Sequence, residues 1–294
     1  MNILPPMMTV WHHCARKYLG DAADIVIFDC SGRLDPREVP GARVHKFLNF
    51  YAATKCNEFI RSIARNRDIA WLCDDDMFFV GKGAADIVQR EMRQPRTASV
   101  SFRARTWWHF DIDGKRYEPS GSYCLALDRG TFVHEGLSLS PADGNAHPPN
   151  PDHRPPGRYD TFDLANEQLI RKGYRTTIVP GEEADRCITG FSGMSGGVML
   201  LSYFRTPEQT LDYFLSPPKK QWGGNVLPGT LAAMLAIRTI LDCYEKIRGK
   251  PYPLPSLPGR RELEKIRSDH AQFIQNQGPL ELTDATGTRL IASL

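Results

Sequence analysis

Short apolar runs alternate with segments of helical periodicity along the first two-thirds of the chain. The runs at residues 24–29 and 69–73 are rich in bulky apolar side chains, which is typical of buried strands. Between them, residues 47–66 carry apolar side chains at helical spacing, which predicts a crossover helix. Strands that alternate with helices in this way predict an α/β fold with a mainly parallel central sheet flanked by helices.

The elements predicted around these runs follow the same alternation. The pattern predicts a weak first strand at 8–11, further strands at 97–105, 123–127 and 174–179, and helices at 84–92 and 163–172. Residues 138–158 contain six prolines and are predicted to form a loop, because proline cannot donate the hydrogen bonds of a regular element. Loops of this length are usually functional or mobile.

Beyond residue 205 the pattern becomes helical. Helices are predicted at 209–215, 229–248 and 260–276, so we expect an α/β domain over 1–205 and a helical C-terminal extension over 206–294. The middle helix carries an apolar stripe formed by Leu231, Met234, Leu235, Ile237, Leu241 and Tyr244. Such a stripe must be covered, by docking on the rest of the chain or by a homodimer.

Composition narrows the class of protein. A chain of 294 residues that is 41% hydrophobic and 24% charged is typical of a packed globular protein. The formal charge of +3 comes from interspersed acidic and basic residues, which argues against nucleic acid as a main partner. Seven cysteines without CxxC spacing, and no signal peptide, predict reduced thiols and a cytoplasmic protein. No segment matches a membrane span, so contact with a membrane would be peripheral.

An acidic triplet, Asp74, Asp75 and Asp76, directly follows the run at 69–73. The carboxyl ends of strands are where open α/β sheets bind ligands, and Asp29 ends the preceding predicted strand. Three adjacent carboxylates repel one another unless a cation lies among them. Mg²⁺ and Mn²⁺ prefer oxygen ligands and share carboxylates with substrate phosphates. The triplet therefore predicts a metal–diphosphate site, with a solvated acidic turn as the alternative.

Residues 71–79, with the sequence WLCDDDMFF, resemble the apolar strand and DxD motif of family 2 and related glycosyltransferases with the glycosyltransferase-A (GT-A) fold. The resemblance covers about residues 8–200. Four other segments support it by their order and spacing: 24–32, 55–58, 121–129 and 159–175. The resemblance implies a GT-A-like α/β fold and a nucleoside diphosphate sugar as the donor.

The resemblance also implies roles for single residues in the donor site. Asp29 and Asn57 match positions that contact the nucleoside, and Asp74 and Asp76 match the pair that brackets the ribose and the metal, with Asp76 as the best metal ligand. Asp75 is a donor-site residue that either binds the metal, supports a ligand or is exposed.

The sequence departs from the family at two places. Trp11-His12-His13 replaces the usual loop after the first strand, and Glu182-Glu183-Ala184-Asp185-Arg186-Cys187 stands where the family often has a metal-binding histidine. The third protein ligand is therefore open. His147 and His153 of the proline-rich loop are candidates, although loop histidines are usually only solvated.

Inverting sugar transfer requires an acceptor-side carboxylate that takes the hydroxyl proton. Asp160 matches the family's acidic motif and is the first choice for this base, with Asp163 as the second. Asp163 is also a candidate N-cap of the helix that follows. Arg105, Trp107 and Trp108 are candidates for acceptor binding, because sugars stack on tryptophan faces, while core packing is the alternative for the tryptophans.

Together these features predict a glycosyltransferase that uses Mn²⁺ or Mg²⁺ to move a sugar from a UDP- or GDP-sugar to a hydroxyl acceptor, with inversion. The acceptor would be a sugar, a lipid-linked group or a small molecule. A retaining transferase on the same fold, a sugar nucleotidyltransferase, and a nucleotide- or sugar-binding protein with a relic site remain as alternatives. The glycine-rich segment 191–197 is interpreted either as a loop that wraps a diphosphate or as a lid.

Overall fold

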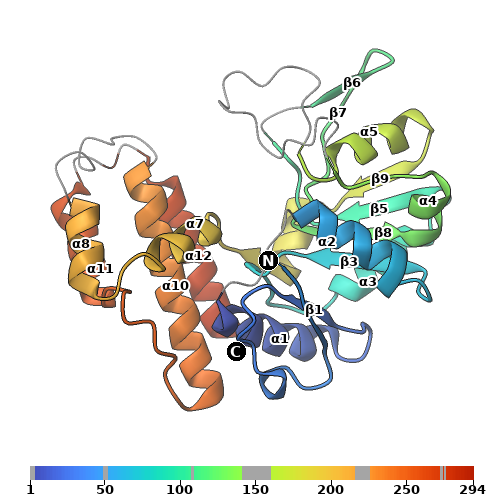
Figure 1. Ribbon diagram of the computed structural model, residues 1–294. Coiled ribbons are helices and arrows are strands. Elements are labelled where there is room, and N and C mark those ends of the chain that lie inside the picture. Colours follow the sequence, from blue (N-terminus) through green and yellow to red (C-terminus); the bar gives the residue numbers. More distant parts are fainter. Residues whose placement is uncertain are drawn as a thin grey trace. The chain divides into compact units, whose positions relative to one another are not determined.

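The chain folds into two compact units, each assembled from separated stretches of sequence in a computed structural model (Figure 1). The structure describes residues 4–48, 52–106, 109–140, 160–215, 226–271, 274 and 276–294. Unit 1 is built from Leu48–Met77 and Gly81–Ile188, and unit 2 from Asn2–Phe47, Phe78–Val80 and Thr189–Leu294. These interleaved units are a different division from the predicted 1–205 and 206–294, which stays a prediction.

Unit 1 contains a four-stranded sheet in the order β3-β8-β5-β9. Strand β8 runs antiparallel to both β3 and β5, and β9 runs parallel to β5. The sheet strands are β3 (Ile69–Cys73), β5 (Thr97–Ser101), β8 (Cys124–Asp128) and β9 (Arg175–Ile178), and a separate hairpin is formed by β6 (Phe110–Ile112) and β7 (Lys115–Tyr117). The α/β class is confirmed, but the sheet is mixed. Because β5 is followed by a hairpin in place of a crossover helix, the chain returns antiparallel as β8.

Helices surround this sheet, as Figure 1 shows. They are α2 (Ala52–Glu58), a π-helical turn (Phe59–Ile63), α3 (Ala84–Met92), α4 (Arg129–His134), α5 (Asp163–Arg171) and α6 (Gly181–Cys187). Strand β3 and helix α3 have the predicted bounds. The described part of the predicted helix 47–66 consists of α2 followed directly by the π turn. One apolar core joins α2, α4 and α5 to the sheet, through buried residues such as Ile60, Phe132 and Leu169.

The topology brings several chain segments to one edge of the sheet. Strands β3, β5 and β9 run in the same direction, so their carboxyl ends meet there, together with the start of the antiparallel β8. The first carboxylate of the acidic triplet is tied to β8, because the Asp74 N–H donates to the Tyr123 carbonyl at 2.8 Å. Helix α5 packs on β9 and comes directly before it in the chain. The end of α5 therefore lies near the start of β9, and the beginning of α5 lies at the edge where β9 ends.

Unit 2 is mainly helical. It contains α1 (Pro5–Leu19), α7 (Met194–Leu201), α8 (Pro207–Leu215), α10 (Val226–Arg248), α11 (Arg260–Asp269), α12 (Gly278–Ser293), a 3₁₀ turn (Pro36–Glu38) and a parallel pair of strands, β1 (Val26–Asp29) and β2 (Arg43–Lys46). Strands β4 (Met77–Phe79) and β10 (Ile188–Gly190) pair with each other. The predicted first strand at 8–11 is wrong, because these residues lie inside α1. Met7, Val10 and Cys14 are buried at helical spacing, and a four-residue window does not reveal that period.

The apolar stripe of α10 is buried within unit 2. Its residues belong to one core with side chains of α1, α7, α11 and α12, and none of the stripe residues is more than 5% exposed. Docking within the chain therefore covers the stripe, and a homodimer through this face is not supported. Among the described residues, no helix has the length and apolar character needed to cross a membrane.

Only residues 191–193 of the glycine-rich segment 191–197 precede a helix, because Met194 begins helix α7, and the predicted role of the segment as a diphosphate loop or a lid stays a prediction. Gly197 lies where α7 meets α10, and a Cβ atom at this position would approach the Ala233 Cβ to 2.8 Å. The neighbouring Gly196 has open space around it. The glycine at 197 is thus a helix-packing residue.

This contrast predicts a stability difference between two substitutions of the same kind. Gly197→Ala should lower the free energy of unfolding by about 1–3 kcal/mol, because the added methyl group overpacks the contact of α7 with α10. Gly196→Ala is the matched control and should be neutral or stabilising by up to about 1 kcal/mol, since alanine favours helix. Urea unfolding of both variants measures the difference. Equal stability of the two variants would contradict the predicted packing role of Gly197.

Candidate functional site

The acidic triplet lies at the end of β3, where its carboxylates are crowded. Asp75 is buried, and Asp74 and Asp76 are half-buried. Burial raises the pKa of Asp74 to about 6, and the neighbouring charge of Asp75 adds to this effect. Burial and the charges of Asp74 and Asp75 raise the pKa of Asp76 well above its ordinary value. The triplet is therefore a place where an added positive charge would be stabilised.

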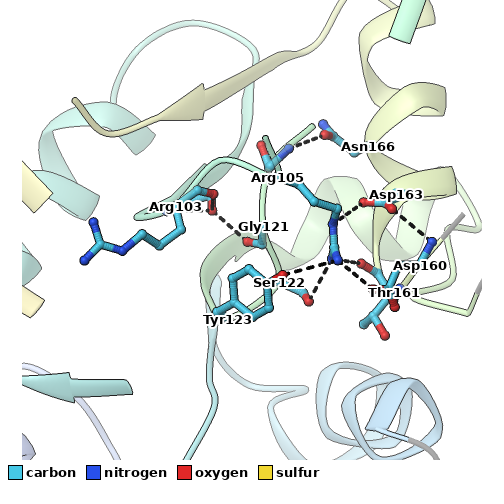
Figure 2. Close-up of polar contacts among 11 residues, drawn as sticks. Arg103, Arg105, Gly121, Ser122, Tyr123, Asp160, Thr161, Asp163 and Asn166 are labelled. Carbon is cyan, nitrogen blue, oxygen red and sulfur yellow. Dashed lines mark hydrogen bonds and ion pairs between the residues drawn. The ribbon is translucent and has the colours of Figure 1, made fainter. Parts of the chain in front are cut away.

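A buried arginine joins Asp160 and Asp163 at the same sheet edge. The Arg105 side chain is 1% exposed and forms ion pairs with Asp160, at 2.6 Å from Nη1 to Oδ2, and with Asp163, at 3.0 Å from Nε to Oδ1. Its Nη2 also donates to the Ser122 hydroxyl and to the Thr161 carbonyl. Figure 2 shows the guanidinium between these groups. The guanidinium is thus buried among its partners, and the predicted contact of Arg105 with an acceptor stays a prediction.

Asp160 is held at two points but stays partly accessible. Its Oδ1 accepts the Thr161 N–H at 2.7 Å, its Oδ2 accepts from Arg105, and 22% of its side chain is exposed. Asp160 thus presents a carboxylate that is held in place and partly exposed.

Asp163 lies behind this carboxylate and is completely buried. Its Oδ2 accepts the Asp160 N–H at 2.9 Å, and burial raises its pKa to about 7 despite the opposing charge of Arg105. Asp163 is the first residue of α5 and Phe162 is the residue that caps the helix, so the predicted N-cap role of Asp163 is wrong. Its carboxylate is used to hold Asp160 and Arg105 instead.

The turn between the two aspartates contains a strained residue. Phe162 has a φ of 74°, in the left-handed region that costs a non-glycine residue about 1–3 kcal/mol. Its ring is fully buried in the core of unit 1, and its N–H donates to the Leu139 carbonyl at 2.9 Å. These contacts hold the turn in place, so that Asp160 and Asp163 both face Arg105.

Tyr123 and Ser122 were not predicted as site residues, although they lie in the small-residue segment 121–129. The Tyr123 hydroxyl accepts from Arg105 Nη1 at 3.5 Å, and the Arg105 guanidinium lies 5.4 Å from the centre of the tyrosine ring. A Cβ atom on Gly121 would come within 2.9 Å of both the Tyr123 ring and the Arg103 carbonyl, so only glycine fits beneath the ring. The sequence signal for Tyr123 was therefore a glycine, Gly121, two residues before an aromatic residue that directly precedes a strand.

The acidic triplet lies close to the Arg105 cluster, which consists of Arg105, Asp160, Asp163 and Tyr123. The charges of Arg105 and Asp160 both act on Asp74, the first lowering and the second raising its pKa. Burial raises the pKa of Tyr123, and among the charges that act on it are those of Arg105, Asp160 and Asp74. Tyr123 therefore lies among aspartates for which the sequence predicted separate roles, Asp74 in donor binding and Asp160 as a base.

Other predicted site residues have structural partners or lie outside the described residues. The Asn57 amide contacts Ser138 and Ser140 and accepts the Leu139 N–H, which fixes the start of the proline-rich segment. Asp29 of unit 2 is 1% exposed, and its carboxylate accepts four hydrogen bonds from its own loop, from Ser31, Gly32 and Leu34. Their contacts with a nucleoside stay predictions. Trp107, Trp108, His147 and His153 lie outside the described residues.

The donor set at the triplet suits a hard divalent cation. Mg²⁺ and Mn²⁺ sites in enzymes commonly use one or two carboxylates and complete their shell with water and substrate phosphates. Asp74 and Asp76 could supply such carboxylates, and burial together with the neighbouring carboxylates raises the pKa of each above its ordinary value. The part of the chain that the structure describes contains no group of three or more His, Cys, Asp or Glu side chains arranged to hold a metal ion.

Comparisons with known proteins leave the family open. Neither a protein-family model nor a curated protein sequence matches this chain. Among solved structures, the chain is similar to mannosyltransferase PcManGT from Pyrobaculum calidifontis in complex with GDP-Man and Mn²⁺. That likeness has a TM-score of 0.43 and 13% sequence identity, and covers 99% of this chain and 82% of the mannosyltransferase. A likeness of this size carries no functional argument, so the function must be argued from the site.

The buried Asp163 predicts a pH dependence of stability. Because its folded-state pKa is raised from 3.8 to about 7, its contribution to stability is complete below about pH 4 and is lost as pH rises through 7. Asp163→Asn removes this titration. Between pH 5 and pH 8, the free energy of unfolding of the variant should therefore rise relative to that of the wild type, by on the order of 1–4 kcal/mol. Urea unfolding at several pH values measures the gain, and Asp111→Asn, at an exposed side chain, gives the background trend. A constant difference across this pH range would contradict the prediction.

Proposed function

We propose that this protein is a metal-dependent glycosyltransferase that moves a sugar from a UDP- or GDP-sugar to an acceptor hydroxyl. The observation that carries the proposal is the meeting of two kinds of carboxylate at one sheet edge. The triplet offers oxygen ligands for a cation, and Asp160 is a separate, partly exposed carboxylate held by Arg105. Transfer from a nucleoside diphosphate requires both a cation for the leaving group and a carboxylate for the attacking hydroxyl.

Asp74 and Asp76 would hold the cation, with Asp75 as a supporting donor-site residue. A bound Mg²⁺ or Mn²⁺ supplies neutralisation of the charge that develops on the leaving diphosphate. Asp29 and Asn57 remain the proposed nucleoside contacts on the basis of the sequence resemblance. His153, Trp107 and Trp108 remain proposals of the same kind for the metal and the acceptor.

Asp160 would act as the general base. It takes the proton of the acceptor hydroxyl while the hydroxyl oxygen bonds to the anomeric carbon and the bond from that carbon to the diphosphate oxygen breaks. The direct displacement inverts the anomeric centre and needs no covalent intermediate. Arg105 would fix the direction of the Asp160 carboxylate by its ion pair, and Asp163 would fix the Asp160 backbone by accepting its N–H, with both Arg105 and Asp163 buried. The anomeric configuration of the product separates this mechanism from a retaining one.

The first prediction from this proposal concerns the cation. UDP or GDP should raise the melting temperature only with Mn²⁺ or Mg²⁺, and Asp76→Asn should abolish this shift and most sugar transfer, because the amide keeps the shape of the carboxylate but loses its charge. Asp86→Asn, at an exposed aspartate of α3, is the matched control and should keep both. Circular dichroism checks the fold. Full turnover in excess chelator would contradict the proposal.

The second prediction separates binding from chemistry. Asp160→Asn should bind UDP or GDP with Mn²⁺ almost normally yet lose about 10²- to 10⁴-fold in turnover, the usual range for a positioned base. Glu167→Gln, a similar change further along α5, should keep wild-type turnover. If Asp160→Asn stays fully active while a folded Asp163→Asn is inactive, the assignment of the base to Asp160 is wrong.

A further inference from the structure

Two free thiols lie directly opposite each other on neighbouring strands beside the acidic triplet. Cys73 is the last residue of β3 and Cys124 is the first residue of β8, and the antiparallel register pairs one with the other. Cys73 directly precedes Asp74 in the chain, and Cys124 directly follows Tyr123. The proposed sugar transfer uses neither thiol, so the pair is a candidate site for chemistry of its own.

The two side chains lie on the same face of the sheet. Directly opposite residues of an antiparallel pair share a face, and so do residues two apart along one strand. The Trp71 indole N–H donates to the Cys124 sulfur at 3.4 Å, so Cys124 lies on the face that Trp71 shares with Cys73. Leu72 and Leu125, their neighbours in sequence, are buried in the core that joins the sheet to its helices. Both thiols therefore lie on the face away from that core.

The hydrogen-bond pattern places the two backbones at a distance that suits a disulfide. The Asp74 N–H donates to the Tyr123 carbonyl at 2.8 Å, which makes Asp74 and Tyr123 a hydrogen-bonded pair of the ladder. In an antiparallel ladder the next pair is not hydrogen-bonded, and its Cα atoms are about 4.5 Å apart. That pair is Cys73 and Cys124. Disulfides span Cα distances of about 4.4–6.8 Å, so a bond between the two sulfurs requires little movement of the strands.

The two thiols differ in exposure, which gives them different roles in an oxidation. Cys73 is half-buried, whereas Cys124 is fully buried. An oxidant from solution therefore reaches Cys73 first, and Cys124 is placed to resolve the product. A small uncharged oxidant such as hydrogen peroxide suits this position better than an anionic disulfide, because the neighbouring Asp74 carboxylate repels anions.

Oxidation of the pair by a peroxide takes two steps. The Cys73 sulfur attacks one peroxide oxygen, the O–O bond breaks, and a sulfenic acid and one water molecule are formed. The Cys124 sulfur then attacks the Cys73 sulfur, and the sulfenic hydroxyl leaves with the Cys124 thiol proton as a second water molecule. Two thiols are thus oxidised to one disulfide, and the peroxide is reduced to water. An added thiol such as dithiothreitol reverses the bond by exchange.

The disulfide would change the turn that carries the acidic triplet. The Cys73 thiol donates to the Met77 carbonyl at 3.5 Å, and this contact spans Asp74, Asp75 and Asp76. A disulfide sulfur has no proton to donate, so oxidation removes this contact and ties Cys73 to β8 instead. The turn then keeps the hydrogen bond from the Met77 N–H to the Asp74 carbonyl, at 3.1 Å, but loses the contact that encloses all three carboxylates.

Cys187 is the competing partner for Cys124. Burial raises the pKa of the Cys187 thiol, and Cys124 is among the groups that add to this effect. The Cys187 sulfur donates to the Lys82 carbonyl at 3.3 Å, and the ladder of β3 and β8 places Cys73, and not Cys187, opposite Cys124. The register therefore favours Cys73.

We propose that Cys73 and Cys124 are a peroxide-sensitive modification site, at which a reversible disulfide loosens the turn of the acidic triplet. The effect of the disulfide on nucleotide binding rests on the proposed function, whereas formation of the disulfide does not.

The first test maps disulfides in the full chain after treatment with hydrogen peroxide and alkylation of the remaining thiols. Trypsin cuts after lysine and arginine, so Cys73, Cys124 and Cys187 fall in the separate peptides 68–82, 117–129 and 187–205. We expect a linked product of 68–82 with 117–129, which is absent from untreated protein and disappears with dithiothreitol. In Cys124→Ala the sulfenic acid of Cys73 is not resolved, so dimedone should label the peptide 68–82.

The second test measures nucleotide binding by calorimetry. The affinity for GDP or UDP with Mn²⁺ should be about two- to fivefold weaker after peroxide, the loss expected for one weak S–H···O contact, and dithiothreitol should restore it. Cys73→Ser cannot form the disulfide, so its affinity should not respond to peroxide. Cys243→Ala, at a buried cysteine of unit 2, is the matched control and should respond as the wild type does.

Each part of the inference has its own contrary result. Peroxide that leaves the peptides 68–82 and 117–129 unlinked, or that links Cys124 to Cys187, would refute the modification site. A mapped disulfide that leaves nucleotide affinity unchanged would refute its effect on the triplet. A reduced, folded protein that binds neither nucleotide with Mn²⁺ would refute the proposed function, while a mapped disulfide would still establish the modification site.

Discussion

The Arg105 guanidinium is enclosed at the sheet edge, with Asp160 and Asp163 on one side and Tyr123 on the other. A buried charge is costly unless it is paired and hydrogen-bonded, so these contacts stabilise the arginine in its buried position. The ion-pair cluster therefore fixes the direction of Asp160, whose side chain is 22% exposed, whereas that of Asp163 is 1% exposed.

The mixed sheet makes this cluster possible. Strand β8 enters between β3 and β5 in the reverse direction, so its first residues lie beside the last residues of β3 and β5. Tyr123 reaches Asp74 and Arg105 for this reason. In a purely parallel sheet, the start of β8 would lie at the opposite edge, and the triplet would lose this neighbour. The reversal that the sequence pattern did not predict is thus part of how the site is built.

The sequence predicted the parts of the fold that depend on local pattern. The apolar run of β3 ends at the triplet, as expected. The helical pattern of residues 84–92 predicted the bounds of α3. The run at 8–11 was misread because a mainly apolar stretch of four residues fits a strand or one helical turn. The roles of Arg105 and Tyr123 depend on neighbours far along the chain. Arginine is rarely fully buried, so the burial of Arg105 could not be predicted from its local sequence.

The central claim is that the triplet holds a divalent cation together with a nucleoside diphosphate, next to Asp160. The most direct measurement is a crystal structure of the protein with Mn²⁺ and GDP or UDP, with anomalous scattering data at the manganese edge. The account predicts an anomalous peak about 2.0–2.3 Å from a carboxylate oxygen of Asp74 or Asp76, in contact with the diphosphate. A diphosphate bound at another place, or a triplet without manganese at saturating nucleotide, would contradict the account.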